Sequence, residues 1–374
     1  MKSILTLLAV AATAMLFVSC GAFGVKLPAA SDQPKTADNT APKAEKPKSD
    51  EPIRIAAGGD IMLGSPFPNA SRMPPNDGAD LLKVVTPIFQ AADIAFANLE
   101  GPMIDSGISA KCGTNHATCF AFRMPTRYAA YLRDAGIDVM SLANNHAGDF
   151  GDLGRETTRK TLESVGIKHA GSDRGEYAMT FLEVKGKKVA VVAFAHNSVV
   201  PNVNELDAAR QLVEKASREA DIVMVSFHGG GEGAVNAHVP QRTEIFLGEA
   251  RGNLPAFART VIDAGADVVI GHGPHVLRGM EIYKDRLIAY SLGNFETYGW
   301  FPLVGATAET LVLEVNLAAD GKFIDGKINP FVQLNRGDLK PDPSKSSIRT
   351  IKRLSQDDFP NTMPKISDDG IIKP

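Results

Sequence analysis

The sequence is poor in the residues that build specialised architectures. Its 374 residues include three cysteines and one tryptophan, and aromatic side chains make up 7%. Three cysteines are too few for a disulfide-built scaffold. The 40 basic and 43 acidic side chains leave no excess of positive charge, so no nucleic-acid partner is expected. With 44% hydrophobic residues the composition is ordinary, and it excludes collagen, coiled coil, wholesale disorder and a multi-span membrane protein.

Long apolar runs are scarce too, and the one that affects targeting lies at the N-terminus. Lys2 precedes a nearly continuous apolar run from Ile4 to Val18, which Ser19-Cys20 closes. The run is shorter than the roughly 20 residues that span a bilayer, so residues 1–20 are predicted to be a secretory signal. Leu16-Phe17-Val18-Ser19-Cys20 resembles a bacterial lipobox, which makes Cys20 a candidate lipidation site. We therefore expect export and lipid anchoring to the bacterial cell envelope; the alternative is ordinary cleavage, with Cys20 incidental.

Residues 21–52 have the composition of a disordered tether. They contain five prolines and five lysines among small and polar residues, too little apolar surface to form a core. A flexible coil of 32 residues has an end-to-end distance of about 30 Å, enough to hold a domain off a lipid surface. A disordered terminus with no role has the same composition.

Export favours a disulfide between the two remaining cysteines. Cys112 and Cys119 lie in one polar, glycine-containing loop, where an oxidising compartment would join them. Metal binding by Cys112, His116 and Cys119 is the alternative, but this spacing fits no standard zinc pattern.

From Ile53 onward, short β-rich runs alternate with amphipathic segments, which predicts an α/β sandwich in one domain over residues 53–336. The predicted strands are Ile53–Ala57, Ile94–Ala97, Val139–Ala143, Lys188–Ala195, Ile222–Phe227, Val268–Ile270, Leu287–Ser291 and an antiparallel pair, Thr310–Leu317 with Phe323–Phe331. The predicted helices are Ala79–Gln90, Thr126–Ala135, Arg155–Val165, Glu205–Ala220, Leu254–Ala264 and Ser347–Ser355. Residues 337–374 form a polar extension that packs on the domain or trails it.

Polar side chains follow six of these strands. They stand in Gly58-Gly59-Asp60, Asn98-Leu99-Glu100, Asn144-Asn145-His146, His228, Gly271-His272-Gly273-Pro274-His275 and Gly293-Asn294. Ligands of open α/β sheets bind beyond the carboxyl ends of strands, so these groups are expected in one crevice. Carboxylate, carboxamide and imidazole without thiolate suit one or two divalent metal ions such as Mn, Fe or Zn. No phosphate-binding loop of the Walker type and no Gly-x-Ser-x-Gly elbow occurs.

Five blocks together resemble the poly-γ-glutamate capsule-biosynthesis (CapA) family. They are Gly59-Asp60-Ile61-Met62-Leu63-Gly64, Asn98-Leu99-Glu100-Gly101-Pro102, Ser141-Leu142-Ala143-Asn144-Asn145-His146, Gly271-His272-Gly273-Pro274-His275-Val276 and Tyr290-Ser291-Leu292-Gly293-Asn294-Phe295. The resemblance implies a calcineurin-like metallophosphatase fold, a four-layer α/β/β/α sandwich. It also implies a part in making or exporting an anionic polyglutamate at the cell envelope.

The resemblance also assigns roles to individual residues. Asp60, Glu100, Asn145, His228, His272 and His275 correspond to metal ligands, with Asn98 as an alternative to Glu100. His146 corresponds to the imidazole that touches substrate or protonates a leaving group. Asn98, Asn144, His196 and Asn294 are candidates for substrate contacts.

Three departures from the metallophosphatase pattern affect the metal site. Met62 stands where ordinary metallophosphatases have a histidine ligand, Glu100 replaces an aspartate, and two residues rather than one separate His272 from His275. One metal position is therefore expected to be weak, altered or empty, and phosphoesterase activity does not follow from the fold.

Each candidate residue, taken alone, also has an ordinary structural explanation. Asp60 would serve as a helix cap, Asn144 and Asn145 as turn formers, and His228 as a hydrogen-bonded core histidine. His196 is as well explained by a structural role, and His116, His169 and His238 are expected on the surface or in loops. Arg278 and Lys284 are better explained as solvated surface charges than as anion attractors. Tyr298 and Trp300 either wall the crevice or pack in the core.

Two functions remain open. The first is a metal-dependent hydrolase or transferase acting on a phosphoester or a glutamyl polymer. The second is a lipid-anchored accessory of a polymer synthase or export complex, which binds an anionic polymer without turnover. The missing histidine at Met62 favours the accessory, whereas the retained ligand set favours a bound metal.

Overall fold

The computed structural model describes residues 50–109, 111–112 and 120–374. Residues 1–49 lie outside this range, and with them the predicted signal, Cys20 and most of the predicted tether. Within the described ranges every helix is too short or too polar to cross a bilayer.

The larger of two stacked sheets has ten strands in the order β17-β18-β15-β14-β1-β2-β3-β4, with β13 paired to β1 and β16 to β15. Their bounds are β1 (Ile53–Met62), β2 (Ile94–Leu99), β3 (Val139–Ser141), β4 (Lys168–Ala170), β13 (Asn294–Thr297), β14 (Glu309–Leu317), β15 (Phe323–Leu334), β16 (Asp338–Pro341), β17 (Lys365–Ile366) and β18 (Ile371–Lys373). β1, β2 and β3 run parallel, as do β1 and β13, so their carboxyl ends meet at one edge.

The smaller sheet has six strands in the order β11-β12-β10-β7-β6-β5. They are β5 (Met179–Val184), β6 (Lys187–Ala195), β7 (Ile222–His228), β10 (Val268–His272), β11 (Met280–Tyr283) and β12 (Arg286–Ala289). Here β6, β7 and β10 run parallel, with His228 directly beside His272 in the register. A separate small hairpin, β8 (Ile245–Phe246) and β9 (Glu249–Ala250), lies in the long segment between β7 and β10.

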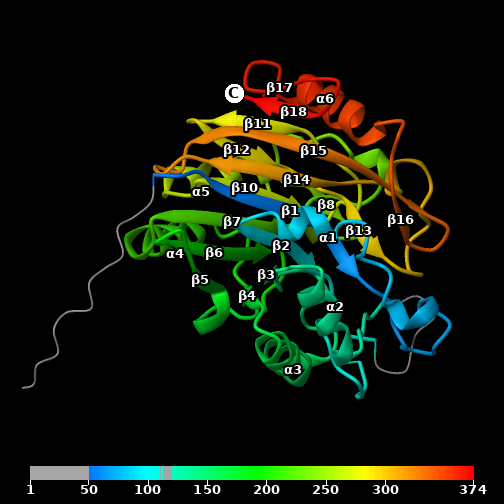
Figure 1. The fold of residues 1–374 in the computed structure, drawn as a ribbon. Helices are drawn as coiled ribbons and strands as arrows, with labels where there is room; N and C mark the ends of the chain where they lie inside the picture. Colours follow the sequence, from blue (N-terminus) through cyan, green and yellow to red (C-terminus); the bar gives the residue numbers. More distant parts are fainter. Residues whose placement is uncertain (1–49, 110, 113–119) are drawn as a thin grey trace, which may run out of the picture. The chain divides into compact units, whose positions relative to one another are not determined.

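Helices cover the outer face of each sheet (Figure 1). They are α1 (Thr86–Gln90), α2 (Ala129–Asp134) and α3 (Gly151–Ser164) on the larger sheet, α4 (Leu206–Glu219) and α5 (Leu254–Asp263) on the smaller, and α6 (Ser346–Asp358) near the C-terminus. α5 begins with a side-chain cap, because the Asn253 amide oxygen accepts the N–H of Ala256 and Pro255 occupies the first turn.

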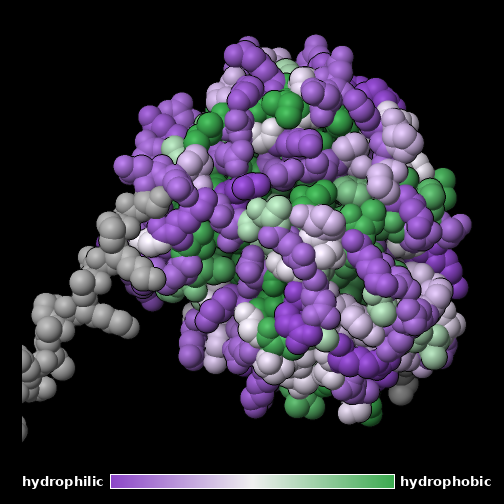
Figure 2. All heavy atoms as spheres, in the orientation of Figure 1, coloured by the Kyte–Doolittle hydropathy of each residue, from purple (hydrophilic) through white to green (hydrophobic). Residues whose placement is uncertain are grey.

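Three hydrophobic cores fill the spaces between the four layers. Between the sheets, Ile55 and Phe96 of the larger sheet pack with Val191, Met224 and Ile270 of the smaller. On the outer faces, Phe89, Leu132 and Leu162 cover the larger sheet, while Val213 and Phe257 cover the smaller. This arrangement is the predicted four-layer α/β/β/α sandwich, which is thereby confirmed. Hydrophilic side chains cover most of the face seen in Figure 2, with hydrophobic residues between them in small patches.

All strands predicted from the sequence are present, but the predicted helix Ala79–Gln90 is too long. Only Thr86–Gln90 forms α1. Pro87 explains the difference, because a helix starting at Ala79 would place this proline in its interior, where it removes a hydrogen bond and clashes. His169, predicted in a loop or on the surface, lies buried on β4 with Nε2 2.9 Å from Glu163 Oε1.

The C-terminal segment from residue 337 pairs with the larger sheet. β16 and β18 both run antiparallel to β15, with Gly326 opposite Ile372. Ile348 and Ile351 of α6 join the core between the sheets. Figure 1 shows α6 and β18, in red, beside β11 and β15.

Candidate metal centre

The carboxyl end of β1 is held tightly against the segment before β13. A Cβ atom at Gly59 would come within 2.1 Å of the Gly293 carbonyl oxygen. The Asp60 N–H donates to that same carbonyl at 3.0 Å. Any side chain at Gly59 would push the two segments apart, so this glycine fixes the position of Asp60.

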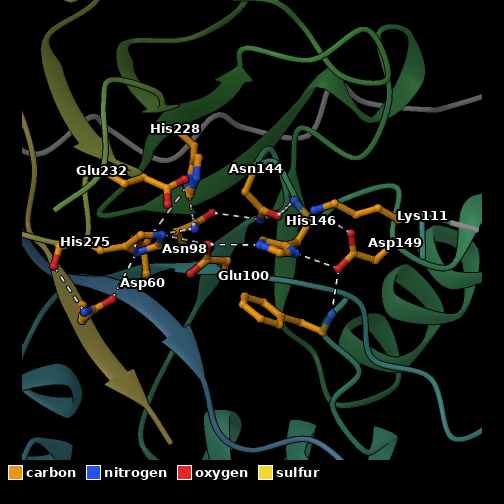
Figure 3. Close-up of polar contacts among 12 residues, drawn as sticks. Asp60, Asn98, Glu100, Lys111, Asn144, His146, Asp149, His228, Glu232 and His275 are labelled. Carbon is orange, nitrogen blue, oxygen red and sulfur yellow. Dashed lines mark hydrogen bonds and ion pairs between the residues drawn. The ribbon is translucent and has the colours of Figure 1, made fainter. Parts of the chain in front are cut away.

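Asp60, Glu100 and His275 form a buried cluster at the strand ends (Figure 3). One ligand atom from each lies within 4.8 Å of the others. The His275 Nδ1 atom is 3.3 Å from Asp60 Oδ2, and its Nε2 atom is 3.5 Å from Glu100 Oε1. Two carboxylates and one imidazole from three separate strand ends thus converge on one point, as the sequence predicted for these residues.

His275 adopts a strained backbone that a neighbouring side chain supports. Its φ of 57° is left-handed, which costs a non-glycine residue roughly 1 kcal/mol. The Asn294 amide group donates to the His275 carbonyl at 3.2 Å, and its oxygen lies 3.1 Å from His275 Nδ1. Asn294 therefore clamps both the backbone and the ring of His275 toward Asp60 and Glu100.

Several ligand atoms in this region have no hydrogen-bond partner among the described residues. They are Asp60 Oδ2, both carboxylate oxygens of Glu100, Asn145 Oδ1 and His228 Nε2, all with almost no solvent exposure. Among them, Asp60 Oδ2 and Glu100 Oε1 have ion pairs with His275. Burying so many polar atoms without hydrogen bonds is costly unless another group binds them. A divalent cation satisfies carboxylate, carboxamide and imidazole together, so the donor set fits the predicted metal.

The charges of the cluster shift the pKa values of its members. Burial raises the pKa of Glu100 to about 8, although the charge of His275 opposes the shift. Burial lowers the pKa of His275, but the facing Glu100 and Asp60 outweigh it and bring that pKa to about 10. Burial raises the pKa of Asp60, but the surrounding histidines outweigh this effect and hold that pKa well below its usual range. Near pH 7 these shifts leave Glu100 and His275 protonated and Asp60 ionised, and a bound divalent cation would displace the protons of Glu100 and His275.

Asn98 links the cluster to His228 and does not reach the cleft. Its amide nitrogen donates to Asp60 Oδ1 at 2.8 Å and lies 3.4 Å from His228 Nδ1. Its oxygen accepts from Asn144, whose amide also donates to the Leu99 carbonyl. Asn98, Asn144 and Asn294 use their polar atoms for internal hydrogen bonds that position neighbouring side chains, and the substrate contacts predicted for them stay a prediction.

His272, also predicted as a metal ligand, is held by neighbouring groups of the protein. Its Nε2 atom lies 3.2 Å from the Gly58 carbonyl oxygen, and its Nδ1 atom lies 3.5 Å from Ser226 Oγ. Both ring nitrogens thus have protein partners, and His272 is absent from the ligand cluster. Met62, which stands where a histidine ligand was expected from the pattern of ordinary metallophosphatases, is buried in the outer core of the larger sheet.

His146, the predicted catalytic residue, is held by a side chain that sequence reasoning missed. Its Nδ1 atom is 2.7 Å from Asp149 Oδ2, and its ring stacks on Phe122 with centroids 3.8 Å apart. Its Nε2 atom lies 3.9 Å from Glu100 Oε1, on the side of the cluster. Asp149 also accepts the Phe122 N–H at 2.7 Å. Burial lowers the pKa of His146, with Asp149 opposing, which favours a neutral ring near pH 7.

The cluster opens into a cleft of about 470 Å³. It is lined by the charged side chains Lys111, Glu232, Glu249 and Arg251, by the aromatic side chains Phe120, Phe122, Trp300 and Phe301, and by Asn145, His146, Leu247, His275 and Pro302. Trp300 therefore walls the crevice, one of the two roles predicted for it. Arg251 is paired with Glu232 at 2.9 Å and Glu249 at 2.8 Å, and Lys111 lies 3.5 Å from Asp149.

Four other predicted positions lie outside the cleft lining. His196 is buried between the His228 carbonyl, 3.4 Å away, and Glu249 Oε2, 3.5 Å away. Arg278, interpreted as a surface charge, is fully buried and forms a bidentate ion pair with Glu244. Lys284 is an exposed partner of Asp263, and His238 an exposed partner of Asp358, as expected for surface residues.

The predicted disulfide remains a prediction. Cys112 is buried and disulfide-bonded, but Cys119 lies outside the described residues, as does His116.

Asp149, Lys111, Glu232 and Arg251 are the site residues that the sequence analysis missed. Asp149 follows His146 by three residues, a spacing that brings two side chains together within one turn of chain. That spacing is the feature of the sequence from which the role of Asp149 could have been predicted. The other three come from long segments between elements, where no pattern predicts the direction of a side chain.

Comparison with known proteins agrees with the sequence blocks. The chain is 29% identical over 300 residues to the PGA biosynthesis protein CapA of Bacillus subtilis, covering 75% of this chain and 72% of that protein. It is 26% identical over 350 residues to the capsule biosynthesis protein CapA of Bacillus anthracis, covering 87% and 78%. Among solved structures, a putative 5'-nucleotidase from Staphylococcus aureus is 13% identical with a TM-score of 0.42, covering 81% of this chain and 58% of that one.

Residues 54–298 match the family of the bacterial capsule synthesis protein PGA_cap. The matched range runs from β1 to the residue after β13 and includes Asp60, Glu100, His146, His228 and His275. It spans more than half of the chain and contains all five blocks on which the resemblance was based. The chain therefore belongs to the bacterial capsule synthesis protein PGA_cap family.

Proposed function

We propose that this protein takes part in the synthesis or export of an anionic polyglutamate at the bacterial cell envelope and that it binds divalent metal in its cleft. The observation that supports the metal site most directly is a set of buried ligand atoms beside His275 that have no hydrogen bond. They belong to Asp60, Glu100, Asn145 and His228. The relatives named for PGA and capsule biosynthesis support the polymer.

Asp60, Glu100 and His275 would hold the first ion, since they already converge. Glu100, Asn145 and His228 offer the unpartnered atoms for a second. Oxygen and imidazole donors without thiolate suit Mn, Fe or Zn. A bound divalent cation would take the place of the protons on Glu100 and His275 and would supply Lewis-acid chemistry.

The chain's own residues equip the cleft to handle anions and protons. His146 directs Nε2 toward the cluster, and Asp149 fixes the opposite ring nitrogen, so the ring can take up or release a proton at Nε2. Lys111 and Arg251 add positive charge along the lining, although Glu232 and Glu249 compensate for Arg251. An anionic chain would therefore depend on bound metal for most of its attraction.

The proposed location is the outer side of a membrane. A lipid on Cys20 would hold the chain there, and residues 21–52 would space the domain from the lipid surface. A polymer synthase or exporter in that membrane would be the partner.

The test uses residues 50–374, which contain all the described strands and cores. We expect this protein to retain Mn²⁺ or Zn²⁺ in elemental analysis after dialysis, and Asp60→Ala and His275→Ala to lose it. His238→Ala is the control, because His238 is an exposed histidine paired with Asp358. If the wild type gains no metal on incubation and shares the melting temperature of Asp60→Ala, the metal-site proposal fails.

A second candidate is hydrolysis, favoured by the His146–Asp149 pair facing the metal cluster. Metal-loaded protein would be incubated with poly-γ-glutamate and with a phosphomonoester, and chain length and free phosphate measured. Turnover that His146→Gln abolishes without loss of metal supports the hydrolase. Metal-dependent binding of the polymer without turnover supports the accessory role.

A further inference from the structure

Large apolar side chains project into solvent around the mouth of the cleft. Val235 is 93% exposed, Leu247 85% and Val304 79%. Leu247 lines the cleft itself, Val235 lies three residues after the lining residue Glu232, and Val304 lies two residues after the lining residue Pro302. We call these three residues the cleft-rim side chains.

The turn of the β8–β9 hairpin shows that folding does not explain this exposure. Leu247 and Gly248 form a two-residue turn with φ angles of 49° and 82°. Such a turn favours Asn at the first position, because a left-handed backbone strains a branched apolar residue. Leu247 therefore destabilises the folded chain in two ways, through its left-handed backbone and through its exposed apolar side chain. Outliers of this kind concentrate at functional surfaces.

The rim side chains stand on separate segments. Val235 lies in the short 3-10 turn Ala234–Asn236, Leu247 at the tip of the hairpin, and Val304 just before the turn Gly305–Thr307. Phe120, which lines the cleft, is also 57% exposed. Aliphatic and aromatic side chains on separate loop tips suit shallow insertion between lipid headgroups.

The tether sets a geometric condition for lipid contact. The domain begins at Ile53, the amino end of β1, whereas the cleft lies beyond its carboxyl end. Ten residues of strand separate the two by about 33 Å. The 32 residues of the tether extend to about 110 Å at most, so the cleft mouth can turn to the surface that holds Cys20.

We infer that the cleft-rim side chains dock the cleft mouth onto the lipid bilayer to which the chain is tethered, an inference that rests on the envelope location proposed above. The lipid on Cys20 would hold the chain at the membrane, and the rim contact would orient the domain on it. The tether keeps the rim at a high effective concentration near the bilayer, so a weak contact suffices. The metal cluster then faces the surface at which an exported polymer emerges.

The test is vesicle binding by residues 50–374, which lack Cys20, so that the rim is measured alone. The probe is a vesicle of phosphatidylethanolamine and phosphatidylglycerol with a fraction of brominated lipid. Trp300 is the single tryptophan of the chain and lines the cleft, so its quenching reports rim contact directly. We expect quenching and co-sedimentation for the wild type. The triple variant Val235→Ser, Leu247→Asn, Val304→Ser should bind at least about tenfold more weakly.

Ile324→Ser is the matched control, since Ile324 is an exposed apolar side chain at the start of β15, near the amino end of β1 and away from the rim. This variant should bind as the wild type does. Leu247→Asn alone should keep or raise the melting temperature, which separates lost docking from lost folding. Failure of the wild type to bind vesicles, or equal loss in the control variant, would overturn the inference and leave a protein as the occupant. Metal content is measured separately, so this failure would not affect the metal centre.

Discussion

His272 and His275 come from the same five residues but have different roles. His272 ends β10 and binds the Gly58 carbonyl, whereas His275, three residues later, reaches Asp60 and Glu100. Gly273, with a φ of 111°, and the left-handed His275 turn the chain between them. Sequence spacing could not distinguish these histidines, because the turn between them decides where each ring points.

We therefore expect His275→Ala and His272→Ala to differ in metal content. His275→Ala removes a ligand and should abolish retention of metal. His272→Ala leaves Asp60, Glu100 and His275 intact, and should lower the free energy of unfolding by about 1–3 kcal/mol through the lost hydrogen bond and packing. Elemental analysis and urea unfolding measure the two effects. Loss of metal in His272→Ala alone would contradict the assignment.

Asp149 is a positioning residue for His146, with no contact to the metal ligands in its hydrogen bonds. Asp149→Asn should leave metal content unchanged but release the His146 ring from the tautomer that has its proton on Nδ1. Nitrogen chemical shifts of labelled histidine measure the tautomer. An unchanged spectrum in a folded, metal-loaded variant would rule out this role.

Among the elements, the longest strands were predicted from the sequence, whereas several of the short ones were not. β1, β6, β7 and β14 are buried runs of seven to ten residues, long enough to show their character in sequence. β13, β17 and β18 have two to four residues, and partners distant in the chain stabilise them. Their pairing depends on tertiary contacts, which no local pattern encodes.

The packing of α6 gives a prediction at this scale. Ile351 is fully buried in the core between the sheets, at the end of the chain that the family match does not cover. Ile351→Ala should lower the free energy of unfolding by about 2–4 kcal/mol through the cavity that it leaves. Arg353→Ala, an exposed position on the same helix, should change it by less than about 0.5 kcal/mol. Equal, small effects would show that residues 337–374 add nothing to stability.

For the whole molecule, the sandwich and the convergence of strand ends followed from the order of the elements. Alternating strands and helices put Asp60, Glu100, Asn145, His228 and His275 near one edge, because parallel strands share a carboxyl end. The lining of the cleft could not be predicted, since Lys111, Glu232 and Arg251 come from long connecting segments. Their directions depend on contacts such as the buried Arg278–Glu244 pair.

The proposed anchor is also a property of the whole chain. Cys20→Ser should move the full-length protein from the membrane fraction toward the soluble fraction, since lipidation at Cys20 is its main attachment. Fractionation of cells that express each form, with metabolic labelling by a fatty acid, measures this. Labelling that persists in Cys20→Ser would show that the lipid, if any, is attached elsewhere.

The most direct measurement is an anomalous difference map from crystals of residues 50–374 grown with Mn²⁺. The account predicts a peak bonded to Asp60, Glu100 and His275 at about 2.0–2.3 Å, with His272 still bound to the Gly58 carbonyl. A well-ordered cleft with no peak at these three residues, or a peak bound by His272 in place of His275, would contradict it.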